Sequence, residues 1–190
     1  MINFLKNYLK PKYTILLLGQ NGTGKTSLVN KLVLDENPSY VPTIGFGIEV
    51  IEFKNYNIQV WDCDLNTIRV IQMLVKNFYL NNPSPVIIFF IDSTSDETKL
   101  KESGELINIL FLNEIHNEDS LLLIFANKQD LPNAMNITNL IDILGLHRLV
   151  SENQLLPSNN KIKWSIQPCS VKRGDGIYEG FNWIEENLKK

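Results

Sequence analysis

A glycine-rich loop after the first apolar run of the chain has the composition of a phosphate-binding site. Glycines let consecutive backbone N–H groups converge on phosphate oxygens, and a following helix adds the positive end of its dipole. In such a loop the lysine reaches the β- and γ-phosphates, and the next hydroxyl can ligate Mg²⁺. The loop matches G-x-x-x-x-G-K-S/T in full and reads Gly19-Gln20-Asn21-Gly22-Thr23-Gly24-Lys25-Thr26, with Ser27 next. It predicts a nucleotide phosphate site.

A second polar loop, about 100 residues downstream, points to guanine as the base. Asn127-Lys128-Gln129-Asp130 follows the apolar run Leu121–Ala126. The Asp130 carboxylate can accept hydrogen bonds from the N1–H and N2–H₂ groups of guanine, whereas adenine offers no matching pair of donors. The stem of Lys128 can lie over the purine plane, and Asn127 can tie this loop to the phosphate loop. Because a carboxylate left unpaired in such a pocket is costly, the quartet argues against ATP and against a P-loop kinase.

Both loops lie where an α/β sheet binds its ligands, beyond the carboxyl ends of strands. Short apolar runs alternate with segments of helical periodicity, which is typical of a three-layer α/β domain. We expect one domain over 13–190, with a six-stranded, mostly parallel sheet and helices on both faces. The expected strands are Tyr13–Leu18, Ile48–Phe53, Ile58–Asp62, Val86–Ile91, Leu121–Ala126 and Lys163–Pro168, and the expected helices are Lys25–Leu34, Thr67–Leu80, Asp96–His116, Ile137–Leu144 and Asp175–Leu188.

Composition narrows the class of protein. The 190 residues carry 18 Lys and Arg against 21 Asp and Glu, a net charge of −3, so binding to nucleic acid is not expected. The longest apolar runs have six residues, whereas a membrane-spanning helix needs about 20. Cys63 and Cys169 belong to no ligand cluster and are expected to be buried thiols of a cytoplasmic protein.

Beyond the two loops, the chain resembles the ADP-ribosylation factor (Arf) family of small GTPases over almost its whole length. The segment Phe125–Met135 reads as that family's guanine loop without a change. Pro42–Phe46, Leu144–His147 and Gly174–Gly180 match the family as well, and few other small GTPases carry this set. The resemblance implies a P-loop small GTPase fold that binds GTP or GDP with Mg²⁺.

The resemblance also implies roles for residues outside the two loops. Thr43 would close over Mg²⁺ and the γ-phosphate, and Asp62 would hold Mg²⁺ through a water, so that Thr26, Thr43 and Asp62 are the expected metal site. Cys169-Ser170-Val171 looks like a third guanine loop, in which the backbone N–H of Ser170 would meet guanine O6.

The family pattern D-x-G-G-Q is broken where GTP would be hydrolysed. After Asp62 the chain reads Cys63-Asp64-Leu65-Asn66. In the family the second glycine donates its N–H to the γ-phosphate, and the glutamine orients the attacking water. Leu65 keeps a backbone N–H but lacks the conformational freedom of glycine. Asn66 is a weak catalytic candidate, because its side-chain amide is one methylene shorter than that of glutamine. Asp64 adds a negative charge close to the expected position of the γ-phosphate. We expect GTP binding with slow hydrolysis.

Two other stretches depart from the family pattern. Between Arg69 and the Val86 strand the chain is about five residues longer, roughly one extra helical turn. Ser151–Lys161 is a polar insertion that we expect to be a surface loop.

The first ten residues predict an amphipathic helix, which Pro11 ends and which forms a segment of its own over 1–12. Its apolar side chains fall on one side of a helical wheel and are Met1, Ile2, Phe4, Leu5, Tyr8 and Leu9. Because position 2 is Ile, N-myristoylation is not expected. Without an acyl chain the helix would bind membranes weakly and reversibly, or it would pack only on its own domain.

Two interpretations of different classes stay open. One is a monomeric Mg²⁺-dependent GTP/GDP switch that works with an exchange factor, an activator and effectors in vesicle traffic, peripheral on membranes such as the Golgi. The other is a GTP-binding interaction module, a pseudo-GTPase with negligible hydrolysis, which the Asp64-Leu65-Asn66 replacement favours.

Overall fold

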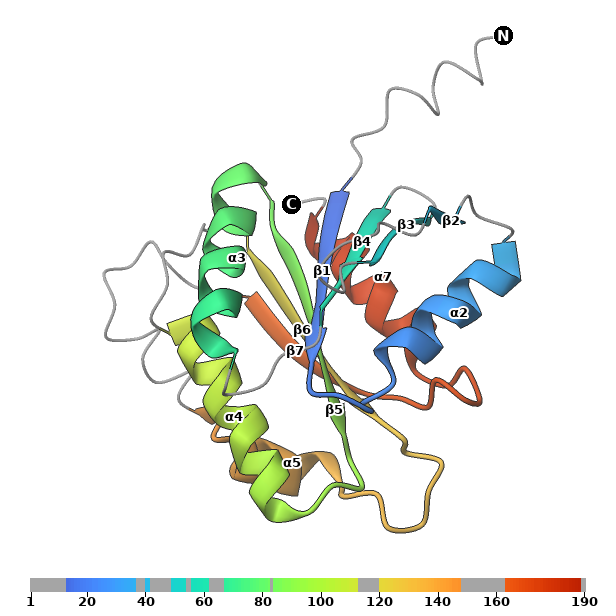
Figure 1. Ribbon diagram of the computed structural model, residues 1–190. Coiled ribbons are helices and arrows are strands. Elements are labelled where there is room, and N and C mark those ends of the chain that lie inside the picture. The colour runs from blue at the N-terminus through green and yellow to red at the C-terminus, as the bar shows by residue number, and fades with distance from the viewer. Residues whose placement is uncertain are drawn as a thin grey trace, which may run out of the picture.

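The computed structural model describes residues 13–36, 40–41, 49–53, 56–61, 67–82, 84–112, 120–147 and 163–188. In this part of the chain seven strands form one sheet, in the order β2-β3-β4-β1-β5-β6-β7 (Figure 1). The strands are β1 (Tyr13–Gly19), β2 (Tyr40–Val41), β3 (Glu49–Phe53), β4 (Tyr56–Val60), β5 (Val86–Asp92), β6 (Leu121–Asn127) and β7 (Lys163–Pro168).

The sheet is mostly parallel, as the continuous apolar runs predicted. β1 pairs in parallel with β4 and β5, and β6 pairs in parallel with β5 and β7. At one edge, β3 runs antiparallel to β4 and β2 runs antiparallel to β3. The expected count of six strands is wrong, because the described sheet includes β2, which pairs with Val50 and Ile51. A strand of two residues is too short to leave an alternating pattern in the sequence.

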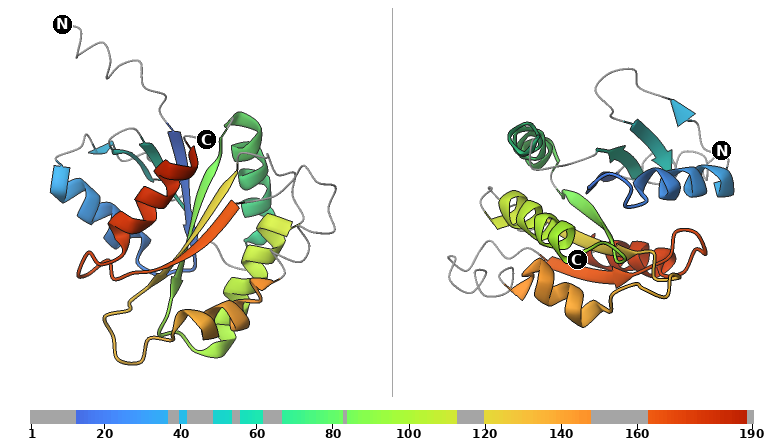
Figure 2. Two further views of the ribbon diagram at one scale, coloured as in Figure 1. Left: turned by 180° about the vertical axis from the view of Figure 1, so that it is seen from behind. Right: turned by 60° about the horizontal axis from the view of Figure 1, so that its bottom comes forward.

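Helices cover both faces of the sheet, which confirms the three-layer α/β architecture (Figure 1 and Figure 2). Strand residues alternate between the faces, as the pleat requires. The helices are α2 (Lys25–Glu36), α3 (Ile68–Asn81), α4 (Glu97–Leu112), α5 (Ile137–Leu144) and α7 (Ile177–Leu188). Leu16 and Leu18 of β1 belong to the core under α3, α4 and α5, while Ile15 and Leu17 belong to the core under α2 and α7.

One predicted helix boundary differs from the structure, because α7 begins at Ile177 and not at Asp175. Other sequence predictions concern residues that the structure does not describe. The predicted extension of α4 to His116, the N-terminal helix over 1–12 and the Ser151–Lys161 insertion all lie outside the described residues. None of the described helices is long and apolar enough to cross a membrane.

Candidate functional site

The glycine-rich loop connects the end of β1 to the start of α2, as its motif requires. Gly24 has a φ of +108°, and a Cβ built on it would lie 2.3 Å from the Asn127 side-chain nitrogen. Only glycine fits there, because backbone conformation and close approach both exclude a side chain. Gly22 has a φ of +77° and nothing within 4 Å of the position its Cβ would take, so its backbone faces open space. The loop therefore has the conformation and the clearance that a phosphate group needs.

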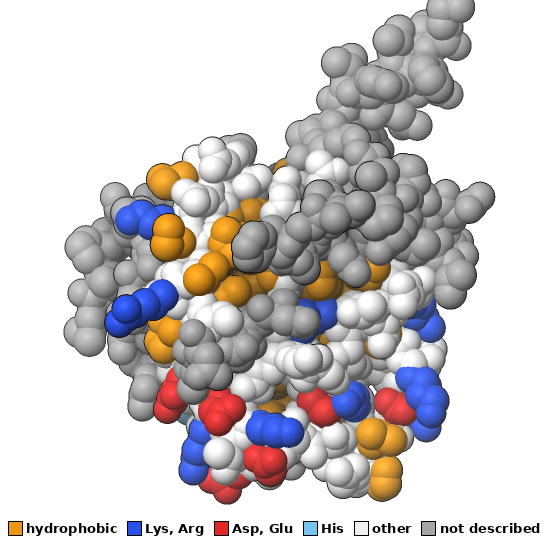
Figure 3. Space-filling model, viewed as in Figure 1, with side chains coloured by type: hydrophobic (Ala, Val, Ile, Leu, Met, Phe, Trp, Pro, Cys, Tyr) orange, Lys and Arg blue, Asp and Glu red, His pale blue; other side chains and the backbone are white. Residues whose placement is uncertain are grey.

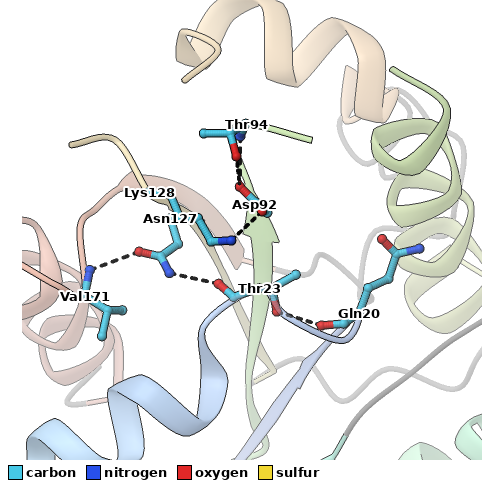
Figure 4. A network of polar contacts seen from close by, with 7 residues as sticks. All are labelled: Gln20, Thr23, Asp92, Thr94, Asn127, Lys128 and Val171. Carbon is cyan, nitrogen blue, oxygen red and sulfur yellow. Dashed lines mark hydrogen bonds and ion pairs between the residues drawn. The ribbon is translucent and has the colours of Figure 1, made fainter. Parts of the chain in front are cut away.

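The phosphate loop holds its own lysine. The ammonium of Lys25 donates to the carbonyl oxygens of Gly19 and Gln20, each at 2.8 Å, and the side chain is 4% exposed. The Thr23 hydroxyl donates to the same Gln20 carbonyl at 2.8 Å (Figure 4). An ammonium has three donors, so in the predicted contact of Lys25 with the β- and γ-phosphates a phosphate oxygen would share the ammonium with these two carbonyls.

Asn127 joins the phosphate loop to the loops that follow β6 and β7. Its side-chain nitrogen donates to the Thr23 carbonyl at 2.8 Å, and its side-chain oxygen accepts from the Val171 N–H at 3.0 Å (Figure 4). The side chain is 3% exposed. The sequence predicted the link to the phosphate loop, and the structure adds the link to Val171. One buried amide thus fixes three loops relative to one another.

Lys128 is held by an ion pair that the sequence analysis missed. Its ammonium lies 2.6 Å from a carboxylate oxygen of Asp92, and its backbone has a φ of +68°. The other Asp92 oxygen accepts from the Thr94 N–H at 2.9 Å and from the Thr94 hydroxyl at 2.7 Å. Burial alone would raise the pKa of Asp92, but the hydrogen bonds from Lys128 and Thr94 outweigh it and leave that pKa below its usual value. Asp92 is the last residue of β5. Its position at the carboxyl end of a strand could have indicated in the sequence that it belongs to the site.

Asp130, the expected guanine-binding carboxylate, accepts a hydrogen bond from the Ser170 hydroxyl at 2.7 Å. This bond is the main reason that the pKa of Asp130 lies below its usual value, and the nearby cations Arg173 and Lys172 act in the same direction. An ionised carboxylate is an acceptor only, so it suits the two donors of guanine.

These loops surround one cavity of about 840 Å³, within the size range of ligand pockets. The phosphate loop and α2 contribute Gly22, Gly24, Ser27, Asn30 and Lys31, and the other two loops contribute Asn127, Lys128, Asp130, Leu131, Val171 and Lys172. The two motifs found in the sequence therefore form a single site.

Comparison of the whole chain with known proteins identifies the family. Residues 1–188 match the model of the ADP-ribosylation factor family. The chain belongs to that family. It is also 38% identical over 179 residues to ADP-ribosylation factor J of Dictyostelium discoideum, a match that covers 94% of this chain and 87% of that protein. The resemblance is confirmed, and the chain is a GTP-binding small GTPase of the Arf family.

In the third guanine loop, the Ser170 N–H donates to the Asp175 carbonyl at 2.9 Å. The expected contact of this N–H with guanine O6 stays a prediction. The turn between β7 and α7 folds Asp175 back onto Ser170 as an isolated β-bridge. The structure adds a contact of the Ser170 side chain, whose hydroxyl donates to Asp130.

The described residues fit a guanine nucleotide, but only part of the expected Arf metal site falls among them. Thr26, in the first turn of α2, is described and offers a hydroxyl, while Thr43 and Asp62 lie outside the described residues. Leu65 and Asn66 lie outside them too, so their roles at the γ-phosphate stay predictions. In the part of the chain that the structure describes, no group of three or more His, Cys, Asp or Glu could hold a metal.

Proposed function

We propose that this Arf-family chain is a Mg²⁺-dependent GTP/GDP switch with slow intrinsic hydrolysis. The observation that carries the proposal is the Asn127 amide, which binds Thr23 of the phosphate loop and Val171 of the third loop around one cavity. We call the loops after β6 and β7 the base half of the site and the loop 19–26 the phosphate half. Because Asn127 joins the two halves, a change at the phosphates can affect the groups that bind the base.

Each part of the site has a chemical task in this proposal. Asp130 accepts from the guanine edge, Lys128 covers the ring, and Lys25 with the loop N–H groups binds the phosphates. Thr26, Thr43 and Asp62 (the last through a water) would hold Mg²⁺, which neutralises phosphate charge when bound.

Slow hydrolysis follows from the residues after Asp62. In-line attack needs a water held opposite the leaving oxygen, and an amide placed about 1 Å away from its proper position can lower the rate on the order of 100-fold. Asn66 is shorter than glutamine by one C–C bond, about 1.5 Å. Leu65 and Asp64 act in the same direction through backbone freedom and charge. The same replacement supports the second candidate, a GTP-binding module with negligible hydrolysis.

The deciding experiment identifies the nucleotide that co-purifies with the chain and then follows single-turnover GTP hydrolysis with Mg²⁺. Guanine nucleotide with slow turnover supports the switch, and no turnover supports the pseudo-GTPase. The triple substitution Asp64→Gly, Leu65→Gly, Asn66→Gln should raise hydrolysis and change GDP affinity less. A wild-type chain that already hydrolyses GTP as fast as the triple variant contradicts the argument from these residues.

An exposed apolar face on α3 supports the recruitment of exchange factors, activators and effectors. Val70, Met73 and Leu80 are 58%, 68% and 67% exposed. Figure 3 shows apolar side chains gathered over α3, at the upper left of the view. Exposed apolar side chains that gather on one face are typical of protein-binding surfaces. The proposed role in vesicle traffic rests on the family alone.

We also propose that residues 1–10 give the monomeric chain a weak, reversible contact with intracellular membranes such as the Golgi. Liposome sedimentation should show stronger binding with a non-hydrolysable GTP analogue than with GDP. Leu5→Glu should weaken binding, whereas Asn3→Glu, which adds the same charge on the polar side, should weaken it less. Equal binding in both nucleotide states would leave the helix as a structural element.

A further inference from the structure

We propose that Gln20 is a positioning residue for nucleotide binding, and that its side chain fastens the phosphate loop to α4. This inference rests on the proposed binding of guanine nucleotides. Gln20 occupies one of the x positions of the phosphate motif, where the motif sets no requirement.

The Gln20 side chain is used at both ends of its amide. The nitrogen donates to a carboxylate oxygen of Glu102 at 3.1 Å, and the oxygen accepts from the Ser103 hydroxyl at 3.1 Å. Ser103 is 3% exposed. Figure 4 shows the Gln20 side chain pointing away from Thr23 and Asn127. It therefore makes a separate connection, to a helix that the Asn127 network does not reach.

The backbone of Gln20 is what this connection positions. Its carbonyl oxygen accepts from both Lys25 and Thr23. A side chain fixed at both ends of its amide restricts rotation of its own residue, and hence the direction of that carbonyl. The contact with α4 therefore acts on the group that holds the phosphate-binding lysine.

α4 is a rigid point of attachment. Gly104, next to Ser103, lies so close to α5 that a Cβ would be 2.5 Å from the Leu144 carbonyl oxygen. Further along α4, Leu106, Ile107 and Leu110 are fully buried. A helix packed this closely moves little, so the loop is fixed to the core and not to another loop.

The hydrogen-bonding pattern allows a reciprocal test. In the double variant Gln20→Glu with Glu102→Gln, the new amide at 102 can donate to the new carboxylate at 20, which also accepts from Ser103. Donors and acceptors are exchanged, and the net charge is unchanged. Gln20→Glu alone instead places two carboxylates against each other.

The experiment measures release of a fluorescent GDP analogue from the full chain, chased with excess GDP. Gln20→Glu should release it about tenfold faster, the equivalent of about 1.4 kcal/mol, and adding Glu102→Gln should restore most of the wild-type rate. The charge-matched control adds Glu105→Gln instead; Glu105 is an exposed acid on the same helix, and this pair should not be rescued.

Thermal unfolding of each nucleotide-free variant separates a loss of fold from a loss of positioning. Equal release from both double variants, or no effect of Gln20→Glu, would overturn the role of Gln20. A wild-type chain that fails to bind the GDP analogue would instead overturn the proposed function, so the two failures are distinguishable.

Discussion

Around the nucleotide cavity, the side chains expected to contact the base are held by partners from other elements, whereas the side chains of Lys25 and Thr23 in the phosphate loop are held by carbonyls of that same loop. Asp130 is bound to Ser170 and Lys128 to Asp92, across 40 and 36 positions of sequence. Lys25 and Thr23, in contrast, donate to carbonyls three to six positions away. The side chains expected to bind the base are therefore held by long-range contacts and the lysine expected to bind phosphate by local ones, although Gln20 and Asn127 also connect the phosphate loop itself to distant elements.

This difference leads us to expect selectivity for the base in one half of the site and the proposed switching in the other. Groups that are already held in the binding geometry need little reorganisation when the base arrives, which favours discrimination between bases. In the phosphate half, Lys25 is held by carbonyls of its own loop, so we expect this half to rearrange more than the base half when a nucleotide binds. The substitutions below test each half, from the largest expected effect to the smallest.

Asp130→Asn should have the largest effect because it breaks the base half at its recognition group. The amide no longer offers two acceptor oxygens to guanine but can pair with the acceptor of xanthine. We expect GTP affinity to fall on the order of 100-fold or more, with a gain for xanthosine triphosphate. Competition titration against both nucleotides measures it, with Asp142→Asn as a control on an exposed aspartate. Unchanged preference for GTP would show that guanine is recognised elsewhere.

Asn127→Ala should disconnect the two halves. It leaves the Thr23 carbonyl and the Val171 N–H without their partner, and each unpaired buried group costs about 1–3 kcal/mol. We expect lower stability in urea unfolding and GDP binding weakened about tenfold or more. The matched control is Asn108→Ala, because the side-chain oxygen of this half-buried residue is buried and has no hydrogen-bond partner to lose. A large loss of stability with unchanged GDP affinity would mean that the halves bind independently.

The sequence alone predicted the parts of the site that are formed by residues close together in the chain. Continuous apolar runs predicted β1, β5 and β6, and the two loops follow β1 and β6 directly. The contacts of Asp92 and Gln20 could not be predicted, because they depend on which strand and helix ends lie together in space. The bond from the Ser170 N–H to Asp175 and the bond from the Ser170 hydroxyl to Asp130 were not predicted either, since the turn that brings Asp175 onto this N–H has no signature at Ser170 itself.

Asp92→Asn should loosen the base half without removing a group that contacts the nucleotide. The substitution keeps the shape of the side chain but removes the charge that faces Lys128, in a pair that is 17% and 33% exposed. A pair of this kind contributes about 1 kcal/mol, so GDP binding should weaken roughly fivefold.

The control for Asp92→Asn is Glu97→Gln, which breaks the exposed pair of Glu97 with Lys101. It should leave GDP affinity, measured by calorimetry, unchanged. Equal effects of the two substitutions would mean that Lys128 needs no partner to take its position.

Ser170→Ala should have the smallest effect at neutral pH and a distinct effect in acid. The Ser170 hydroxyl holds the pKa of Asp130 below its usual value, and we expect guanine binding to use the ionised carboxylate. A lowered pKa keeps the carboxylate ionised as pH falls, so the contribution of Asp130 is present above that pKa and is lost as pH falls through it. Without the hydroxyl the pKa of Asp130 rises toward its usual value. GDP affinity should therefore begin to fall at a higher pH in Ser170→Ala than in the wild type.

Titration of GDP affinity between neutral pH and the onset of acid unfolding, followed by circular dichroism, measures this shift. Ser170→Thr keeps a hydroxyl and should follow the wild-type profile, which separates the hydrogen bond from a change in packing. If Ser170→Ala also follows the wild-type profile, the hydroxyl does not set the ionisation of Asp130. The cations Lys172 and Arg173 would then be the groups to substitute, because they act on the same carboxylate through charge alone.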